Sequence, residues 1–145
     1  MGLFGNRQSQ TDERLEALTA EYQNYRRRTV LEMETVGVRS ARKTAAVFLQ
    51  VYDDLQRALA SNCTDAAFYQ GIEMIQKNLL SAFDSLDIRP MDSKGRIFNP
   101  DYHEAVEQLR DPQYRAGEIV EVLQTGFTMD EEVIRHAKVV VANCE

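Results

Sequence analysis

A histidine followed by spaced carboxylates is the nearest that this sequence comes to a metal or catalytic motif. His103-Glu104 with Glu107 reads HExxE, which lacks the second histidine of the HExxH zinc motif. The alternative, which we favour, is a histidine held by local hydrogen bonds. His136 has no acidic neighbour within four residues except Glu132. We therefore expect no metal ion and no cofactor.

The remaining carboxylates and thiols indicate no reaction either. The run Asp130-Glu131-Glu132 is typical of a solvated turn, and no carboxylate pair stands out as having one raised pKa. Cys63 and Cys144 have neither CxxC nor metal-ligand spacing, so we expect reduced thiols in a cytoplasmic protein. Phosphate-loop and nucleophile-elbow patterns are also missing from the sequence. These patterns favour a binding protein over an enzyme.

Charge is divided unevenly along the 145 residues, which carry 23 Asp and Glu against 17 Lys and Arg. Residues 12–57 hold eight acidic and eight basic side chains, whereas residues 58–145 hold fifteen acidic and eight basic ones. The acidic second half disfavours nucleic acid or an anionic membrane surface as a ligand. The three residues Arg26 to Arg28 fan through about 200° on a helix, and Arg28 can pair with Glu32. We therefore expect no nucleic acid partner.

No apolar run is long enough for a transmembrane helix, and the first residues do not form a signal peptide. We therefore expect no membrane association.

From Thr11 to Ala60 the chain has no proline and a single glycine, Gly37, and would be about 75 Å long as one helix.

Apolar or small residues recur along this helix in steps of 3, 4 and 4, an eleven-residue repeat that lets two helices lie side by side nearly straight. We expect a homodimer, parallel or antiparallel, because the rest of the chain is too small to cover such a helix. The alternative is one long helix lying on its own C-terminal domain. The predicted dimer interface consists of Tyr22, Tyr25, Thr29, Met33, Val36, Ser40, Thr44, Val47 and Val51.

A second helix is predicted after the break Ser61 to Asp65, with Thr64 or Asp65 as its N-cap. Its apolar stripe ends near Asp87. Gly71 lies inside the helix and hints at close helix packing. A helix this short needs tertiary support, so we expect the four helical segments of a dimer to form a bundle.

The pattern changes after Pro90, where residues 119–124 and 133–142 are predicted as β-rich segments separated by glycine and proline turns. The fold class is therefore α+β, with a long N-terminal helix that pairs in a homodimer, a short helical bundle and a small C-terminal β domain. We expect a flexible N-terminus over residues 1–10, a dimerisation stalk over 11–60, the second helix over 61–89 and a β head over 90–145.

Four parts of the chain match the pattern of one protein family. They are AEYQNYRRR from Ala20, DLQRAL from Asp54, GIE from Gly71, and the β head with Phe98-Asn99-Pro100, HEAV from His103, Gly126-Phe127 and Ile134-Arg135 followed by Ala137, Val139 and Val141. In these motifs the sequence resembles the GrpE-type nucleotide exchange factors, the co-chaperones of DnaK-type chaperones. The resemblance covers nearly the whole chain from Ala20.

This resemblance implies a parallel homodimer in which one β head contacts the nucleotide-binding domain of a DnaK-type chaperone. The contact would weaken ADP binding so that ATP can enter, in support of protein folding and the stress response. The positions implied as partner contacts are Arg27, Ser61, Phe98, Leu123, Glu132 and Val141. Phe98, Leu123 and Val141 have the alternative role of head core. Glu132 stands where the family commonly has a basic residue, so a stalk dimer or adaptor without exchange activity remains a second hypothesis.

Overall fold

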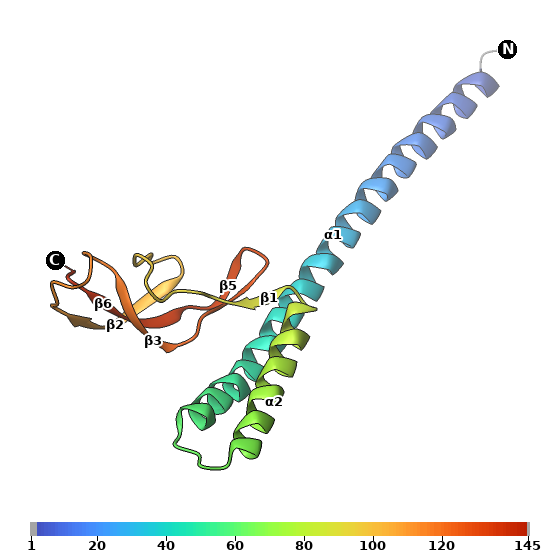
Figure 1. Ribbon diagram of the computed structural model, residues 1–145. Helices are drawn as coiled ribbons and strands as arrows, with labels where there is room; N and C mark the ends of the chain where they lie inside the picture. The colour runs from blue at the N-terminus through green and yellow to red at the C-terminus, as the bar shows by residue number, and fades with distance from the viewer. Residues whose placement is uncertain (1–2, 145) are drawn as a thin grey trace. The chain divides into compact units, whose positions relative to one another are not determined.

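The computed structural model describes the backbone of residues 3–144 and the side chains of residues 5–144. The chain divides after Ala41 into two compact units. The first helix, α1, runs over Leu3–Ala60, and α2 runs over Ala66–Asp84 (Figure 1). Neither helix, over its described residues, is apolar enough along its length to cross a membrane.

α1 begins earlier than the sequence analysis predicted. Residues 3–10, expected to be flexible, are helical, while residues 1 and 2 lie outside the described residues. No proline interrupts this segment, and the Thr11 hydroxyl donates to the carbonyl oxygen of Arg7 at 2.8 Å, one turn earlier. The helix therefore extends through residues that carry no apolar stripe of their own.

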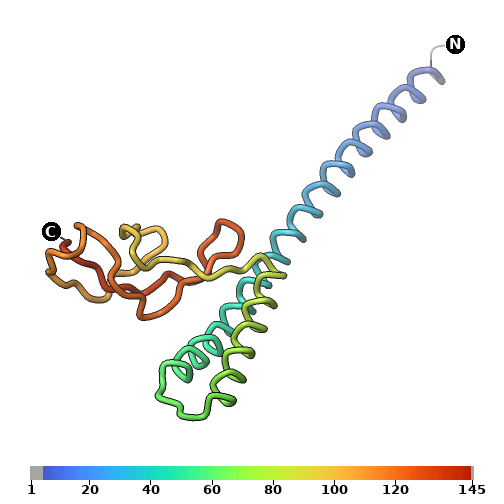
Figure 2. Tube along the Cα trace, viewed as in Figure 1, coloured from blue at the N-terminus to red at the C-terminus, as the bar shows by residue number. Residues whose placement is uncertain are grey.

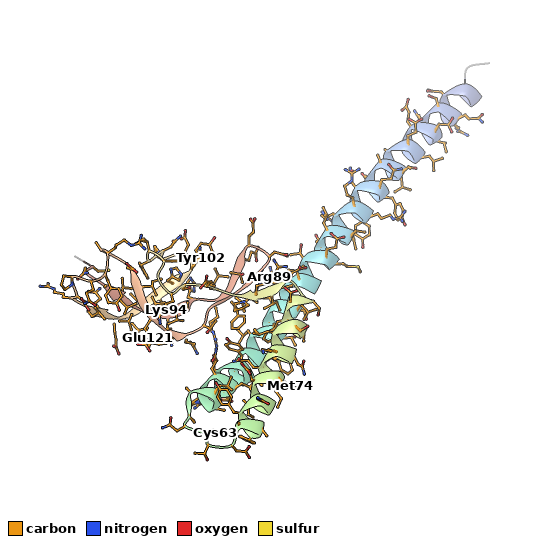
Figure 3. All side chains as sticks on the ribbon, viewed as in Figure 1. Cys63, Met74, Arg89, Lys94, Tyr102 and Glu121 are labelled. Carbon is orange, nitrogen blue, oxygen red and sulfur yellow. The ribbon has the colours of Figure 1, made fainter. Side chains whose placement is uncertain are left out.

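α2 begins at the predicted cap. The Asp65 carboxylate accepts hydrogen bonds from the backbone N–H groups of Ala67 and Phe68, at 3.0 and 3.1 Å. These bonds satisfy two of the donors that a helix start leaves free. The loop before α2 is short, and the tube in Figure 2 shows α2 running back along the C-terminal part of α1. Cys63 lies exposed in that loop (Figure 3).

Gly71 lies in open space within its own chain, and its close packing in a bundle with a second copy stays a prediction. A Cβ atom added at Gly71 would meet nothing within 4 Å inside the described chain. α2 ends at Asp84, before the predicted Asp87, and Asp87 takes a left-handed conformation with φ of 59°. The turn leads at once into the first strand, so the β head begins at Ile88, two residues earlier than predicted.

The β head contains two three-stranded sheets. One has the strand order β1-β4-β5 with antiparallel neighbours, and the other has the order β2-β6-β3, with β2 parallel and β3 antiparallel to β6. The strands are β1 Ile88–Pro90, β2 His103–Leu109, β3 Ile119–Gln124, β4 Phe127–Met129, β5 Glu132–Arg135 and β6 Ala137–Ala142.

Two features of the head differ from the sequence prediction. The predicted segment 133–142 is divided at His136 into β5 and β6, which belong to different sheets. β2 was not predicted as a strand, because its sequence HEAVEQL is rich in residues that favour helices. Its pairing with β6, in which His103 lies opposite Ala137, overrides that local preference.

The centre of the head is apolar and closed. Ile119 on β3 and Ala137, Val139 and Val141 on β6 have no exposed surface, and Ile119 lies opposite Val141 in the β3–β6 ladder. The half-buried side chains that cover this cluster are Met91, Phe98, Val122 and Cys144.

Gly126, before β4, is required by a close approach. A Cβ atom at this position would lie 2.5 Å from the backbone nitrogen of Ala137 and 2.6 Å from the sulfur of Met91. A side chain there would force the two sheets apart, so the glycine of the Gly126-Phe127 motif has a packing role.

Candidate partner-binding surface and the head junction

An aromatic cluster joins the β head to the helices. The ring of Phe127 on β4 is fully buried and meets Tyr52 of α1 edge to face at a centroid distance of 5.0 Å. Phe83 of α2 meets the same ring at 5.8 Å. Edge-to-face pairs at these distances add to the free energy of apolar burial. Phe127 therefore links α1, α2 and the head at one point.

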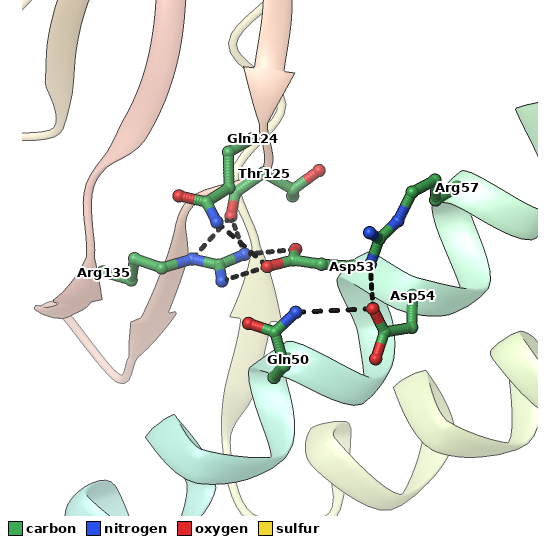
Figure 4. A network of polar contacts seen from close by, with 7 residues as sticks. All are labelled: Gln50, Asp53, Asp54, Arg57, Gln124, Thr125 and Arg135. Carbon is green, nitrogen blue, oxygen red and sulfur yellow. Dashed lines mark hydrogen bonds and ion pairs between the residues drawn. The ribbon is translucent and has the colours of Figure 1, made fainter.

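A charged network lies beside this cluster, and we call Asp53, Gln124, Thr125 and Arg135 the junction clamp (Figure 4). The Arg135 guanidinium donates to both carboxylate oxygens of Asp53, at 2.7 and 2.8 Å. It also donates to the Thr125 carbonyl oxygen, at 2.6 Å from Nη2 and 3.1 Å from Nε. The Gln124 amide donates to the same carboxylate at 2.9 Å. A helix carboxylate is thus bound by groups from two strands.

Glu132, at the start of β5, forms a second link to α1. Its carboxylate pairs with the guanidinium of Arg42, and both side chains keep contact with solvent. Glu132 thus has a cationic partner within its own chain.

His103 is held by hydrogen bonds on both ring nitrogens. The backbone N–H of Asn99 donates to Nδ1 at 3.0 Å, so Nε2 carries the proton and donates to the buried Ser93 hydroxyl at 3.0 Å. Burial lowers the pKa of His103, and the positive charges of His136 and Arg96 lower it further. The histidine therefore acts as a neutral structural group that holds the loop before β2.

The HExxE pattern lies on a strand whose register shifts between Ala105 and Glu107, so that Glu104 lies opposite Lys138 and Glu107 opposite Val140. Among residues 3–144 no group of three or more His, Cys, Asp and Glu side chains is arranged to hold a metal ion.

Leu123 lies half exposed in a cleft between α1 and the head. The cleft holds about 550 Å³, and Asp53 and Gln124 of the junction clamp also line it. Ala60 lies at its helical end, next to Ser61, which is exposed and whose hydroxyl donates to the Arg57 carbonyl oxygen at 3.0 Å. Leu123 and the end of α1 therefore face one hollow.

Two predicted head contacts are placed against the core. Val141 has no exposed surface and belongs to the β3–β6 cluster, so its side chain has the alternative role, head core. Phe98 is half-buried and packs on the same cluster, with its ring centroid 6.1 Å from that of His103. Of these two residues, Phe98 alone has exposed surface that a partner can contact.

Arg27 and most residues of the predicted dimer interface belong to residues 3–41. We call these interface residues, which follow one another along one side of α1, the stripe. Arg27 lines a shallow groove on α1 with Val30 and Leu31 between polar residues. Apolar stripe residues are exposed throughout α1: Tyr22 by 62%, Met33 by 70% and Val36 by 64%. Figure 3 shows the side chains of this part of α1 projecting outward all along the helix. Within their own helical unit these stripe side chains are therefore accessible.

Sequence reasoning missed the junction itself. Ala45, Leu49 and Tyr52 are buried, yet the predicted stripe follows Val47 and Val51 on the other side of the helix. Asp53 was not singled out, because its partner Arg135 is 82 residues away and no local spacing relates them. After Arg42 the sequence of α1 has apolar residues on two faces of the helix. This second apolar face was the one sequence signal that could have indicated the junction.

Comparison with known proteins identifies the family. The GrpE family model matches residues 4–143, which include both helices and all six strands. Protein GrpE of Bacteroides fragilis is 38% identical over 128 residues, covering 86% of this chain and 66% of that protein. Protein GrpE of Clostridium acetobutylicum is 36% identical over 131 residues, covering 90% of this chain and 65% of that protein. Protein GrpE of Chlorobaculum tepidum is 32% identical over 130 residues, covering 85% of this chain and 67% of that protein. The chain thus spans about two thirds of the length of these relatives, and it belongs to the GrpE family.

Proposed function

We propose that this protein is a nucleotide exchange factor for a DnaK-type chaperone. The observation that carries the proposal is the family match over residues 4–143, which includes the helices, the junction and the head. No covalent step is required, since the protein acts by binding.

The proposed mechanism is a shift between two states of the chaperone. ADP binds the closed nucleotide-binding domain better, whereas the exchange factor binds the open one better. Each ligand then lowers the affinity of the other by the same factor, typically about 5- to 150-fold. ADP leaves faster, and ATP can take its place.

The residues proposed as chaperone contacts come from both units of the chain. Leu123 is a suitable apolar contact because it is 50% exposed at the rim of the cleft that reaches Ala60. Phe98 and Ser61 retain accessible surface, and Arg27 offers a cation on α1. Val141 contributes by supporting the head from within.

The proposed assembly is a homodimer formed through the α1 stripe. Val47 and Val51 are 72% and 45% exposed, and they continue the stripe of Met33 and Val36 along the helix. A second copy of the same stripe is the simplest surface that would remove these side chains from water.

The second hypothesis is an adaptor that binds without promoting exchange, and the observation that favours it is Glu132. Its carboxylate pairs with Arg42, so this position provides no positive charge to an acidic surface of a partner. Under this hypothesis the chaperone would bind equally well with and without ADP.

Stopped-flow release of fluorescent ADP from a DnaK-type chaperone separates the two hypotheses. Exchange activity predicts release faster by about tenfold or more at saturating protein. An unchanged release rate, with chaperone binding retained, would leave the adaptor hypothesis standing.

A further inference from the structure

We propose that Asp53 and Arg135 are positioning residues that hold the β head at one orientation on residues 42–60 of α1, and that this rigidity couples chaperone binding to ADP release. The inference rests on the proposed exchange function. It assigns to the junction clamp a role distinct from contact with the chaperone.

The clamp is built as a directional contact. Arg135 presents its planar guanidinium to both oxygens of Asp53, and its side chain is 22% exposed while that of Asp53 is 18% exposed. A bidentate pair fixes the relative orientation of its partners, because both hydrogen bonds are lost when either group rotates. Partial shielding from water strengthens such a pair.

The same guanidinium is fixed on the head side. Its two bonds to the Thr125 carbonyl oxygen tie it to the segment before β4, and its centre lies 5.7 Å from the Phe127 ring centroid. Gln124, at the end of β3, adds an independent bond to Asp53. One helix carboxylate therefore anchors both sheets of the head, through Gln124 on β3 and Arg135 on β5.

Apolar contacts alone do not set an orientation so narrowly. The Phe127 cluster holds the head against the helices, but edge-to-face pairs are favourable over centroid distances of about 4.5–7 Å and so tolerate some rotation of the head. The head is connected covalently to the helices only through the turn at Asp87, between α2 and β1. The clamp adds a bidentate contact to the Arg42–Glu132 ion pair, and it is the contact that most narrowly restricts the angle of the head on α1.

A fixed angle matters because exchange requires that binding favour the open chaperone over the closed one. A head that could turn freely on α1 would adapt to the closed nucleotide-binding domain as well as to the open one. A ligand that binds two states with equal affinity does not shift the equilibrium between them. Loss of the clamp should therefore reduce the coupling between factor and ADP more than it reduces binding itself.

The test compares three variants of the full chain: Asp53→Asn, Arg135→Lys and the control Asp54→Asn. Asp54 is the next residue on α1 and pairs only along the helix, with Arg57 and Gln50. For each variant, chaperone affinity is measured by titration with and without saturating ADP, and their ratio is the coupling factor. Circular dichroism verifies folding, and the isosteric Asp53→Asn carries the test if Arg135→Lys does not fold.

We expect the coupling factor to fall about tenfold, toward one, in both clamp variants and to stay at the unmodified value in Asp54→Asn. Simple destabilisation lowers both affinities together and leaves their ratio unchanged. An unchanged ratio in Asp53→Asn overturns the inference while the exchange function stands. No coupling in the unmodified chain overturns both.

Orientation is measured separately by residual dipolar couplings of backbone amides in the unmodified chain and in Asp53→Asn. We expect one alignment tensor to fit residues 42–144 of the unmodified chain, and the head of the variant to show reduced couplings relative to its helices. Couplings in the variant that still fit one tensor would overturn the positioning role.

Discussion

Residues 3–41 and 42–60 belong to one helix yet differ in how they meet water. In the second part Ala45, Leu49 and Tyr52 are 4%, 1% and 5% exposed, and the ring of Tyr52 packs against Phe127 of the head. Among the described side chains of residues 5–41 no apolar one is buried to that degree, and Leu15 and Leu18 are both 62% exposed. The same helix therefore buries one segment within its own chain and leaves the other available to another molecule.

The second part shows both behaviours on opposite sides. Leu49 is buried, whereas Val47 and Val51, two positions away and about 200° around the helix, are exposed. A helix that lies only on its own domain would need no second apolar face. The junction face packs against the head, and the stripe is the surface through which we propose that a second copy binds.

Charge in the stripe should break the dimer that we propose, and this is the largest effect expected. Val36→Glu combined with Val47→Glu would bury unpaired carboxylates, each costing about 3 kcal/mol or more. We expect light scattering to give the monomer mass of 16.6 kDa, against twice that value for the unmodified chain.

The matched control is Val38→Glu, which introduces the same charge at an exposed valine outside the stripe. It should leave the dimer intact. Equal masses for the double variant and the unmodified chain would mean that the stripe is not the interface.

Removal of the Phe127 ring should disrupt the junction. Phe127→Ala deletes the side chain that touches Tyr52 and Phe83, and we expect it to lower the free energy of unfolding by about 3–5 kcal/mol in urea titration. Val106→Ala on β2, where the side chain is 50% exposed, should change it by less than about 0.5 kcal/mol. Similar small losses for both variants would show that the head is not supported by this ring.

Two glycines sharpen the contrast between packed and open positions. Gly126→Ala places a methyl group against Ala137 and Met91 and should destabilise the head by about 1–3 kcal/mol. Gly71→Ala in α2 meets nothing within 4 Å and should stabilise the protein by up to about 1 kcal/mol, as measured by thermal unfolding. Destabilisation at Gly71 would instead indicate that a second copy packs closely there.

The smallest effect expected is on the pH dependence of stability. Because burial lowers the pKa of His103 in the folded state, the unfolded chain binds the proton more tightly. Stability should therefore fall as pH drops below the ordinary histidine value of about 6.5, by at most about 1.4 kcal/mol per pH unit.

His103→Gln should remove this dependence, as followed by urea titrations at several pH values. His136→Gln should only weaken it, since the charge of His136 is a secondary cause of the shift. A pH dependence that survives in His103→Gln would assign it to another group.

Local patterns were sufficient for the helices and for part of the head. The Asp65 cap and the absence of proline from Thr11 to Ala60 are short-range signals, and both α1 and α2 formed as predicted apart from their ends. β3 and β6 follow apolar runs. These elements depend mainly on the residues that compose them.

Long-range pairing explains the rest. β2 is a strand because β6 lies beside it, although its own residues favour a helix. Asp53 and Arg135 meet only when the whole head has folded, and Val141 could be assigned to the core only once both sheets were known. Charge alone could not reveal that Glu132 pairs with Arg42.

The measurement that tests the central claim most directly is the rate of fluorescent ADP release from a DnaK-type chaperone at increasing concentrations of the unmodified chain. We expect a release rate that rises with concentration and reaches a plateau about tenfold or more above the intrinsic rate. A release rate that stays constant across the titration would contradict it.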